Sequence, residues 1–153
     1  MSVKLTRLFG DRKPVIAMVH FGALPGAPLY DAAGGLAALL EGCRKDLHAL
    51  QEAGFDAVMF GNENDRPYEF KVDVASTATM AYVIGQLRSE ITIPFGVNVL
   101  WDPESSIALA AATGRTIDQT GVTTYRPPFT PVPLKIIAGR RRAELLNPVR
   151  RLV

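Results

Sequence analysis

Three short apolar runs recur in the first two thirds of the chain, and each one ends in polar side chains. They occupy residues 14–19, 57–60 and 95–100. An apolar run without alternation is typical of a strand that is covered on both faces, as in a parallel sheet between helices. The middle run is the clearest, because Ala57–Phe60 is followed by Gly61 and then by the four polar residues Asn62–Asp65. We therefore predict three buried strands.

Helical periodicity follows each predicted strand. Residues 34–53 carry apolar side chains three, four and seven positions apart, which indicates one buried stripe. Its members are Leu36, Leu39, Leu40, Cys43, Leu47 and Leu50. Gly54 then stands where a left-handed C-cap favours glycine. A second helix is predicted over residues 73–90, with the inward positions Val74, Ala75, Ala78, Tyr82 and either Ile84 or Leu87. A third is predicted over residues 104–113, opened by Asp102 as the N-cap. A short helical lead-in is expected at residues 5–9.

The order of strand, loop and helix, repeated three times, predicts an α/β fold with a parallel sheet. Residues 115–153 break this order. They hold five of the 11 prolines and the run Arg140–Arg142, with eight basic residues against two acidic ones, whereas residues 1–114 hold nine basic and 13 acidic residues. Proline removes a backbone donor and excludes a central strand or a helix. We expect an irregular basic tail outside the fold, which divides the chain into residues 1–114 and 115–153.

Composition narrows the class of protein. A chain of 153 residues, 48% of them hydrophobic, suits one domain with a real core. The single cysteine, Cys43, excludes an internal disulfide and fits a reducing compartment. The polar N-terminus does not resemble a signal peptide, and apolar runs are far shorter than the roughly 20 residues that cross a bilayer. We expect a cytoplasmic protein. The arginine run lacks interleaved aromatic residues, so nucleic acid is not expected as a partner.

Polar residues at the ends of the first two strands are the candidates for chemistry, because ligands bind at the carboxyl ends of parallel strands. His20 ends the first strand and suits proton transfer near neutral pH; the alternative is a hydrogen bond to the loop behind it. Glu63 suits a general base or a metal ligand, with Asn62 and Asn64 orienting substrate oxygens. The alternative for Glu63 is a helix cap or an ion pair with Arg66.

The third strand adds three more candidates. Asn98 lies within an apolar strand, and a buried amide is costly unless it bonds a ligand or a structural partner. Trp101 at the strand's end offers a ring that can stack on a sugar or a base, while Asp102 either binds substrate or only caps the next helix. No metal site is fixed by spacing, although Asp65 and Asp102 could approach Glu63 to make the oxygen-rich site that Mg²⁺ requires.

Three segments, in the same order, resemble the BtpA/SgcQ family. They are Val19–Pro28 (VHFGALPGAP), Asp56–Glu63 (DAVMFGNE) and Ile93–Asp102 (IPFGVNVLWD). The resemblance covers roughly residues 3–114. It implies a (β/α)8 TIM barrel similar to the ribulose-phosphate-binding barrels, of which this chain would hold about three βα units.

The resemblance also implies two possible roles. SgcQ-like members are implied to be enzymes of small phosphorylated sugars or nucleosides, and another branch is associated with photosystem I biogenesis at membranes. The segment Val97–Pro103 is more similar to the SgcQ-like branch. On the enzyme reading we expect His20 and Glu63 to carry proton transfer, with Asn62, Asn64, Asn98, Trp101 and Asp102 around the substrate. The biogenesis reading is a scaffold without catalysis.

The resemblance stops at Gly114, before a fourth strand. A barrel needs about 250 residues and eight strands, so we expect a truncated, inactive form whose tail is read from a shifted frame. The codons for Pro128–Val132, read one frame over, permit the Val-Tyr-Ala-Ser-like stretch of the family. An incomplete barrel would leave strand edges unpaired, which favours self-association.

Overall fold

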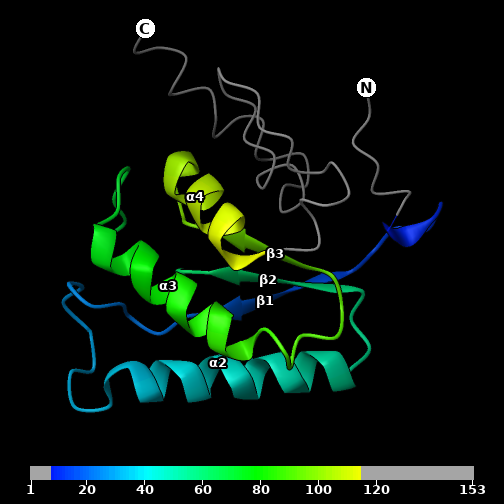
Figure 1. Cartoon of the computed structure of the whole chain (residues 1–153), viewed down its shortest axis with the longest axis horizontal. Helices are drawn as coiled ribbons and strands as arrows, with labels where there is room; N and C mark the ends of the chain where they lie inside the picture. Colours follow the sequence, from blue (N-terminus) through cyan, green and yellow to red (C-terminus); the bar gives the residue numbers. More distant parts are fainter. Residues whose placement is uncertain (1–7, 115–153) are drawn as a thin grey trace, which may run out of the picture.

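The computed structural model describes residues 8–114. Within them, three strands alternate with three helices (Figure 1), which confirms the predicted α/β fold. The elements are β1 (Ile16–His20), α2 (Gly35–Glu52), β2 (Ala57–Gly61), α3 (Val74–Leu87), β3 (Phe95–Asn98) and α4 (Pro103–Thr113). The predicted tail at residues 115–153, and all but the last two residues of the predicted lead-in helix, lie outside the described residues. No helix in the described part is long and apolar enough to cross a membrane.

The strands form one parallel sheet in the order β1-β2-β3. All five residues of β2 are buried, and this strand has a hydrogen-bonded neighbour on each side. The register aligns His20 with Gly61 and Gly61 with Asn98. The carboxyl ends of the three strands therefore meet at one rim of the sheet.

Alternate residues of the strands face opposite sides of the sheet. One face packs against the helices and makes the main core, in which Phe60 lies between Phe21 and Phe95 with ring centroids 6.2 and 6.1 Å apart. Val19 and Val97 belong to the same core. The opposite face carries the rows Met18, Met59, Gly96 and His20, Gly61, Asn98. We call this face, opposite the one that packs against the helices, the inner face.

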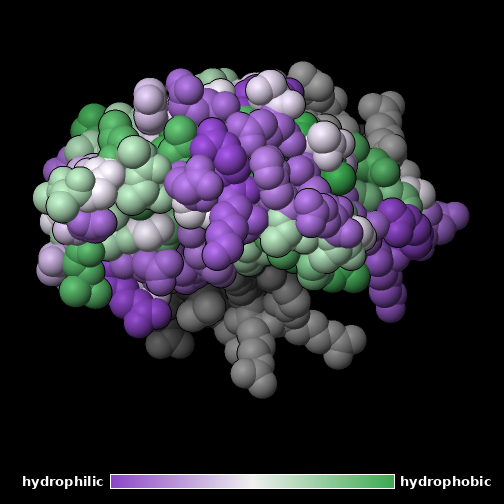
Figure 2. All heavy atoms as spheres, turned by 90° about the horizontal axis from the view of Figure 1, so that it is seen from below, coloured by the Kyte–Doolittle hydropathy of each residue, from purple (hydrophilic) through white to green (hydrophobic). Residues whose placement is uncertain are grey.

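The apolar stripe of α2 is confirmed. Leu39, Cys43 and Leu47 are buried, while Leu36 in the first turn is 40% exposed. Gly54 has φ +78°, the left-handed conformation expected of a glycine after a helix. The polar residues of α2 face outward and contribute to the hydrophilic band across the middle of the molecule in Figure 2.

The predicted inward face of α3 is wrong in part. Val74 is 83% exposed and Tyr82 is 49% exposed, and Ala75 and Ala78 are also exposed. The helix instead buries Ser76, Thr79, Met80, Val83, Ile84 and Leu87, of which only the last two were predicted, as alternatives. Small and apolar residues occupy every side of this helix, so its periodicity does not specify one face.

The amino ends of the strands are held together by charged residues. Asp56, just before β2, accepts a hydrogen bond of 2.8 Å from the backbone N–H of Val15 and pairs with Arg12. The Val15 N–H first, and the Arg12 guanidinium second, lower the pKa of Asp56 below its usual value. Glu90 after α3 pairs with Arg44 of α2, with Nε and Oε2 3.1 Å apart. These contacts fix the end of the sheet opposite the rim.

Candidate functional site

Two of the predicted site residues, His20 and Asn98, lie in one row on the inner face, at the rim. Neighbouring strands are about 4.8 Å apart, so the two backbones are separated by about 10 Å with Gly61 between them. The His20 side chain is exposed. Its imidazole is therefore accessible to a small molecule at the rim.

Asn98 has the least expected environment in the described part of the chain. It is 2% exposed, and its Nδ2 atom is the one buried side-chain donor there with no hydrogen-bond partner. Buried polar groups are nearly always paired, because an unpaired donor carries the full penalty of losing water. No atom of the described residues accepts a hydrogen bond from this amide, so an acceptor from outside them would stabilise it.

Glu63 lies just beyond the end of β2 and is half-buried. Within residues 8–114 its carboxylate makes no hydrogen bond or ion pair, so the predicted alternative of a pair with Arg66 is not formed there. Its backbone carbonyl accepts a hydrogen bond of 2.9 Å from the hydroxyl of Tyr68. The loop from β2 to α3 thus holds the Glu63 backbone and leaves the carboxylate available.

The side chains of Asn62 and Asn64 form hydrogen bonds to the backbone of the loops at the rim. Asn62 is 2% exposed, and its Oδ1 accepts a hydrogen bond of 2.7 Å from the backbone N–H of Leu100. Asn64 donates from Nδ2 to the carbonyl of Phe21, at 2.7 Å. Each amide joins the loop after β2 to the chain that leaves a neighbouring strand. Their geometry suits fixing the rim, with Asn62 on the helix side of the sheet.

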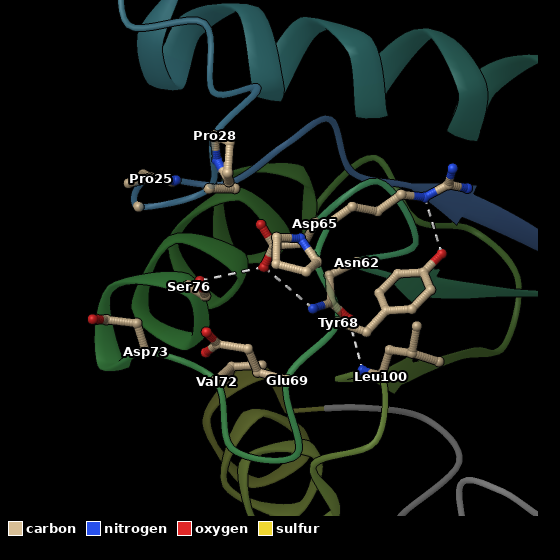
Figure 3. Close-up of a pocket in the computed structure, with 14 residues that line it drawn as sticks. Pro25, Pro28, Asn62, Asp65, Tyr68, Glu69, Val72, Asp73, Ser76 and Leu100 are labelled. Carbon is tan, nitrogen blue, oxygen red and sulfur yellow. Dashed lines mark hydrogen bonds between the residues drawn. The ribbon is translucent and has the colours of Figure 1, made fainter.

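Asp65, which the sequence suggested only as a possible Mg²⁺ ligand, joins three segments of the rim through its carboxylate. Its Oδ1 accepts from the backbone N–H of Leu24 at 3.1 Å, and its Oδ2 lies 3.5 Å from both Asn62 Nδ2 and Ser76 Oγ. These partners come from the loop after β1, the end of β2 and the first turns of α3. Figure 3 shows the carboxylate between Ser76 and Asn62. Leu24 is 41 residues away from Asp65 along the chain, so no local sequence pattern predicts their hydrogen bond.

A small cavity of about 150 Å³ lies beside Asp65, between the loop after β1 and the loop after β2. Pro25 and Pro28 form one wall in Figure 3, and Glu69 and Val72 lie across from them. Asn62 lines this cavity, whereas Asn98 and His20 do not. The rim therefore carries two separate features, the inner-face row and this outer cavity.

Asp102 caps α4. Its Oδ1 accepts from the backbone N–H of Ser105 at 3.0 Å, and its Oδ2 accepts from the Ser105 hydroxyl at 2.8 Å and from the backbone N–H of Val72 at 3.0 Å. The side chain is 3% exposed. The capping alternative is therefore the one observed, and Asp102 also anchors the loop before α3.

Trp101 has φ +64°, which is uncommon for a residue with a large side chain. Its ring is stacked on Phe70 and meets the edge of Tyr68, with both centroid distances 5.4 Å. Trp101 is 47% exposed and Phe70 is 76% exposed. The loops after β2 and β3 therefore share an aromatic cluster at the rim, with ring surface free to contact a ligand.

No three His, Cys, Asp or Glu side chains among residues 8–114 are grouped closely enough to hold a metal ion. Asp65 and Asp102, the carboxylates considered for Mg²⁺, are both used by loop and cap hydrogen bonds. Cys43 is buried in the core, and burial raises the pKa of its thiol to about 12. Cys43 therefore serves as a small apolar residue in the packing of the core.

Comparison with known proteins gives a family. The family model described as the BtpA family matches residues 11–120. The chain is 54% identical over 110 residues to the "Putative sgc region protein SgcQ" of Escherichia coli (strain K12), a match that covers 72% of this chain and 41% of that protein. No solved structure matches the chain.

Archaeal relatives are also similar. An uncharacterized protein of Thermococcus kodakarensis is 43% identical over 90 residues, covering 59% of this chain and 34% of the relative. An uncharacterized protein of Archaeoglobus fulgidus is 33% identical over 101 residues, covering 65% of this chain and 40% of the relative. The chain therefore spans about two fifths or less of the length of these relatives. With a family model matching most of its length, the chain belongs to the BtpA family.

Proposed function

We propose that the inner-face rim is part of the active site of a barrel enzyme that acts on a small phosphorylated sugar-like or nucleoside-like metabolite. The observation that carries the proposal is the buried Nδ2 of Asn98, which has no hydrogen-bond partner among residues 8–114 and lies in the same row as the exposed His20, with Gly61 between them. A substrate hydroxyl or carbonyl oxygen at the rim would satisfy the amide. The carboxyl ends of the strands are the place where barrel enzymes hold their catalytic groups.

Two side chains are available for proton transfer. The carboxylate of Glu63 has no partner among the described residues, and the imidazole of His20 is exposed at the same rim. One can remove a proton from substrate while the other returns one, and positioned acid–base groups of this kind contribute about 10²–10⁴ in rate. Asn98 orients the oxygen nearest the reacting carbon. Asn62, Asn64 and Asp102 hold the loops that frame the rim.

The described residues supply three strands, and a closed barrel uses eight. Part of the substrate contacts would then come from strands that full-length relatives carry beyond the matched region, including the phosphate site expected after strands seven and eight. We expect turnover from a full-length relative, and little or none from the described residues alone. Within those residues no contact or charge favours the alternative, a noncatalytic role in membrane-complex biogenesis.

The test uses a full-length relative such as SgcQ, screened against phosphorylated sugars and nucleosides. In a relative that has a glutamate at the position matching Glu63, replacing it by glutamine should lower kcat by about 10²–10⁴ while the circular dichroism spectrum stays unchanged. A control replaces the glutamate, where the relative has one, that matches Glu52 at the exposed end of α2. Unchanged turnover in the first variant would exclude Glu63 as the base. A screen with no turnover in any class would contradict the proposal as a whole.

A further inference from the structure

Gly61 occupies the centre of the inner-face row, and its backbone conformation does not require glycine. The described glycines with positive φ are Gly10, Gly26, Gly35, Gly54 and Gly114. Gly61 is not among them, and it ends the central strand of the sheet. Glycine in a strand weakens it, because glycine loses more backbone freedom on folding and has no side chain to pack. A glycine without a conformational reason calls for another explanation.

Packing does not require glycine at this position either. A Cβ built on Gly61 would lie 3.1 Å from Cε of Met18 and 3.7 Å from the carbonyl oxygen of Asn98, and apart from the adjacent residues no other heavy atom of residues 8–114 lies within 4 Å. The methionine contact is tight, but it involves the far end of a flexible side chain that can shift. An alanine would therefore fit after a small movement of Met18.

The two neighbours of Gly61 in the row both present polar side chains. Asn98 lies on one side, with its buried Nδ2 unpartnered among the described residues, and His20 lies on the other side, exposed. In-register residues on adjacent strands point to the same face of a sheet. The missing side chain at position 61 thus leaves space between an amide that lacks an acceptor and an imidazole.

We infer that the bare backbone of Gly61 is the floor of a binding position for an oxygen-bearing group of a small ligand. The oxygen accepts a hydrogen bond from Asn98 Nδ2 and lies within reach of His20. The inference rests on the proposed function in placing the ligand at this rim, and it adds that Gly61 determines the size of the group that enters. A hydroxyl and a phosphate both provide such an oxygen.

The first test needs no ligand. Gly61→Ala should leave the melting temperature equal to or above that of the unmodified chain, and Gly61→Ser should raise it further, because the serine hydroxyl can accept from Asn98 Nδ2. In an Asn98→Ala background, serine should give no gain over alanine. The matched controls Gly42→Ala and Gly42→Ser lie on α2, where a Cβ comes within 4 Å of no described residue outside the surrounding helix backbone. The serine variant should not be more stable than the alanine variant there.

Two results of this test would overturn the inference. A lower melting temperature for Gly61→Ala would show that glycine is a packing requirement. Equal melting temperatures for the serine and alanine variants would show that the Asn98 amide does not face this space.

The second test uses two probes, D-ribose and inorganic phosphate, followed through the ¹⁵N–¹H signals of the Asn98 side chain in the complete chain. We expect a saturable shift with at least one probe, and its loss in Gly61→Ala but not in Gly42→Ala. A response to ribose alone assigns a hydroxyl to the position, and a response to phosphate alone assigns a phosphate. If neither probe shifts the Asn98 signals, or if the shift in Gly61→Ala equals that in the unmodified chain, the inference is overturned.

Failure of this inference can be told apart from failure of the proposed function. If a full-length relative turns over a substrate and the Gly61→Ala equivalent keeps its kcat/KM, the binding position is wrong while the enzyme proposal stands. If the Asn98 signal responds as expected but no substrate is turned over, the binding position stands and the catalytic proposal falls.

Discussion

Replacing Asn62 by aspartate tests whether this residue holds the rim together. Its Oδ1 accepts from the Leu100 N–H at 2.7 Å, and its Nδ2 lies 3.5 Å from Oδ2 of Asp65. Aspartate keeps the acceptor for Leu100 but places a second carboxylate against Asp65. At about 4 Å, two like charges repel by about 1 kcal/mol in water and about 4 kcal/mol near a protein surface. Because Asn62 is 2% exposed, we expect Asn62→Asp to cost about 1–4 kcal/mol at pH 7.

The cost should depend on pH with a definite sign. A neighbouring carboxylate raises the folded-state pKa of the pair above the unfolded value of about 3.9. The folded variant then binds more protons than the unfolded one, so its stability relative to the unmodified chain increases as the pH falls from 7 through the raised pKa. Urea unfolding of the variant and of the unmodified chain, at pH 7 and near pH 4, measures this change. Subtracting the free energy of unfolding of the unmodified chain from that of the variant at each pH cancels the contribution of other groups.

Two further variants complete this experiment. Asn62→Ala leaves the Leu100 N–H without its acceptor and should cost about 1–3 kcal/mol at both pH values. Adding Asp65→Asn to Asn62→Asp exchanges the carboxylate and the amide, removes the repulsion, and should recover part of the loss at pH 7. If Asn62→Asp is as stable as the unmodified chain at pH 7, or if its cost is the same at both pH values, the contact between residues 62 and 65 is not the one described.

Three other predictions follow from the core and from the amino ends of the strands. Phe60→Ala removes a fully buried ring from between two others and should cost about 3–5 kcal/mol, measured by urea unfolding; a cost near zero would contradict the central position of β2. The pKa of Asp56 is lowered by the Val15 N–H and then by Arg12, so its stabilising contribution is present above the unfolded pKa and is lost as the pH falls through the lower folded value. Asp56→Asn should therefore have a lower urea midpoint than the unmodified chain near neutral pH, and this difference should shrink as the pH falls through the folded pKa of Asp56. A difference that does not change with pH would contradict this assignment. Burial raises the pKa of Cys43 to about 12, so a disulfide reagent should label it at pH 8 only when urea unfolds the chain, and rapid labelling of the folded chain would refute its burial.

Local signals in the sequence determined much of the fold. The unbroken apolar run at residues 57–60 identified a buried central strand, and β2 is buried throughout. The signals that predict where the helices begin and end were also local. Asp102 caps α4 through the N–H of Ser105, three residues away, and Gly54 and Gly114 adopt the left-handed conformation that ends a helix. Caps and periodicity act within a few residues, so they can be read without knowing the fold.

Only the tertiary structure decided which polar residues at the rim face the inner side. His20 and Asn98 do, whereas Asn62 and Asp102 are committed to partners 38 and 30 residues away in the loops that frame the rim. Successive residues of a strand point to opposite faces, so a shift of one position exchanges a ligand-facing side chain for one that faces the helices. The sequence alone does not carry that register.

The buried face of α3 was decided in the same way. Apolar and small residues occur on all its sides, so its orientation depends on the packing of α2 and α4 beside it, and Val74 and Tyr82 face solvent. Where one face of an element is distinctly apolar, as in α2, the sequence is sufficient; where several faces are nearly equivalent, neighbouring elements select the one that is buried.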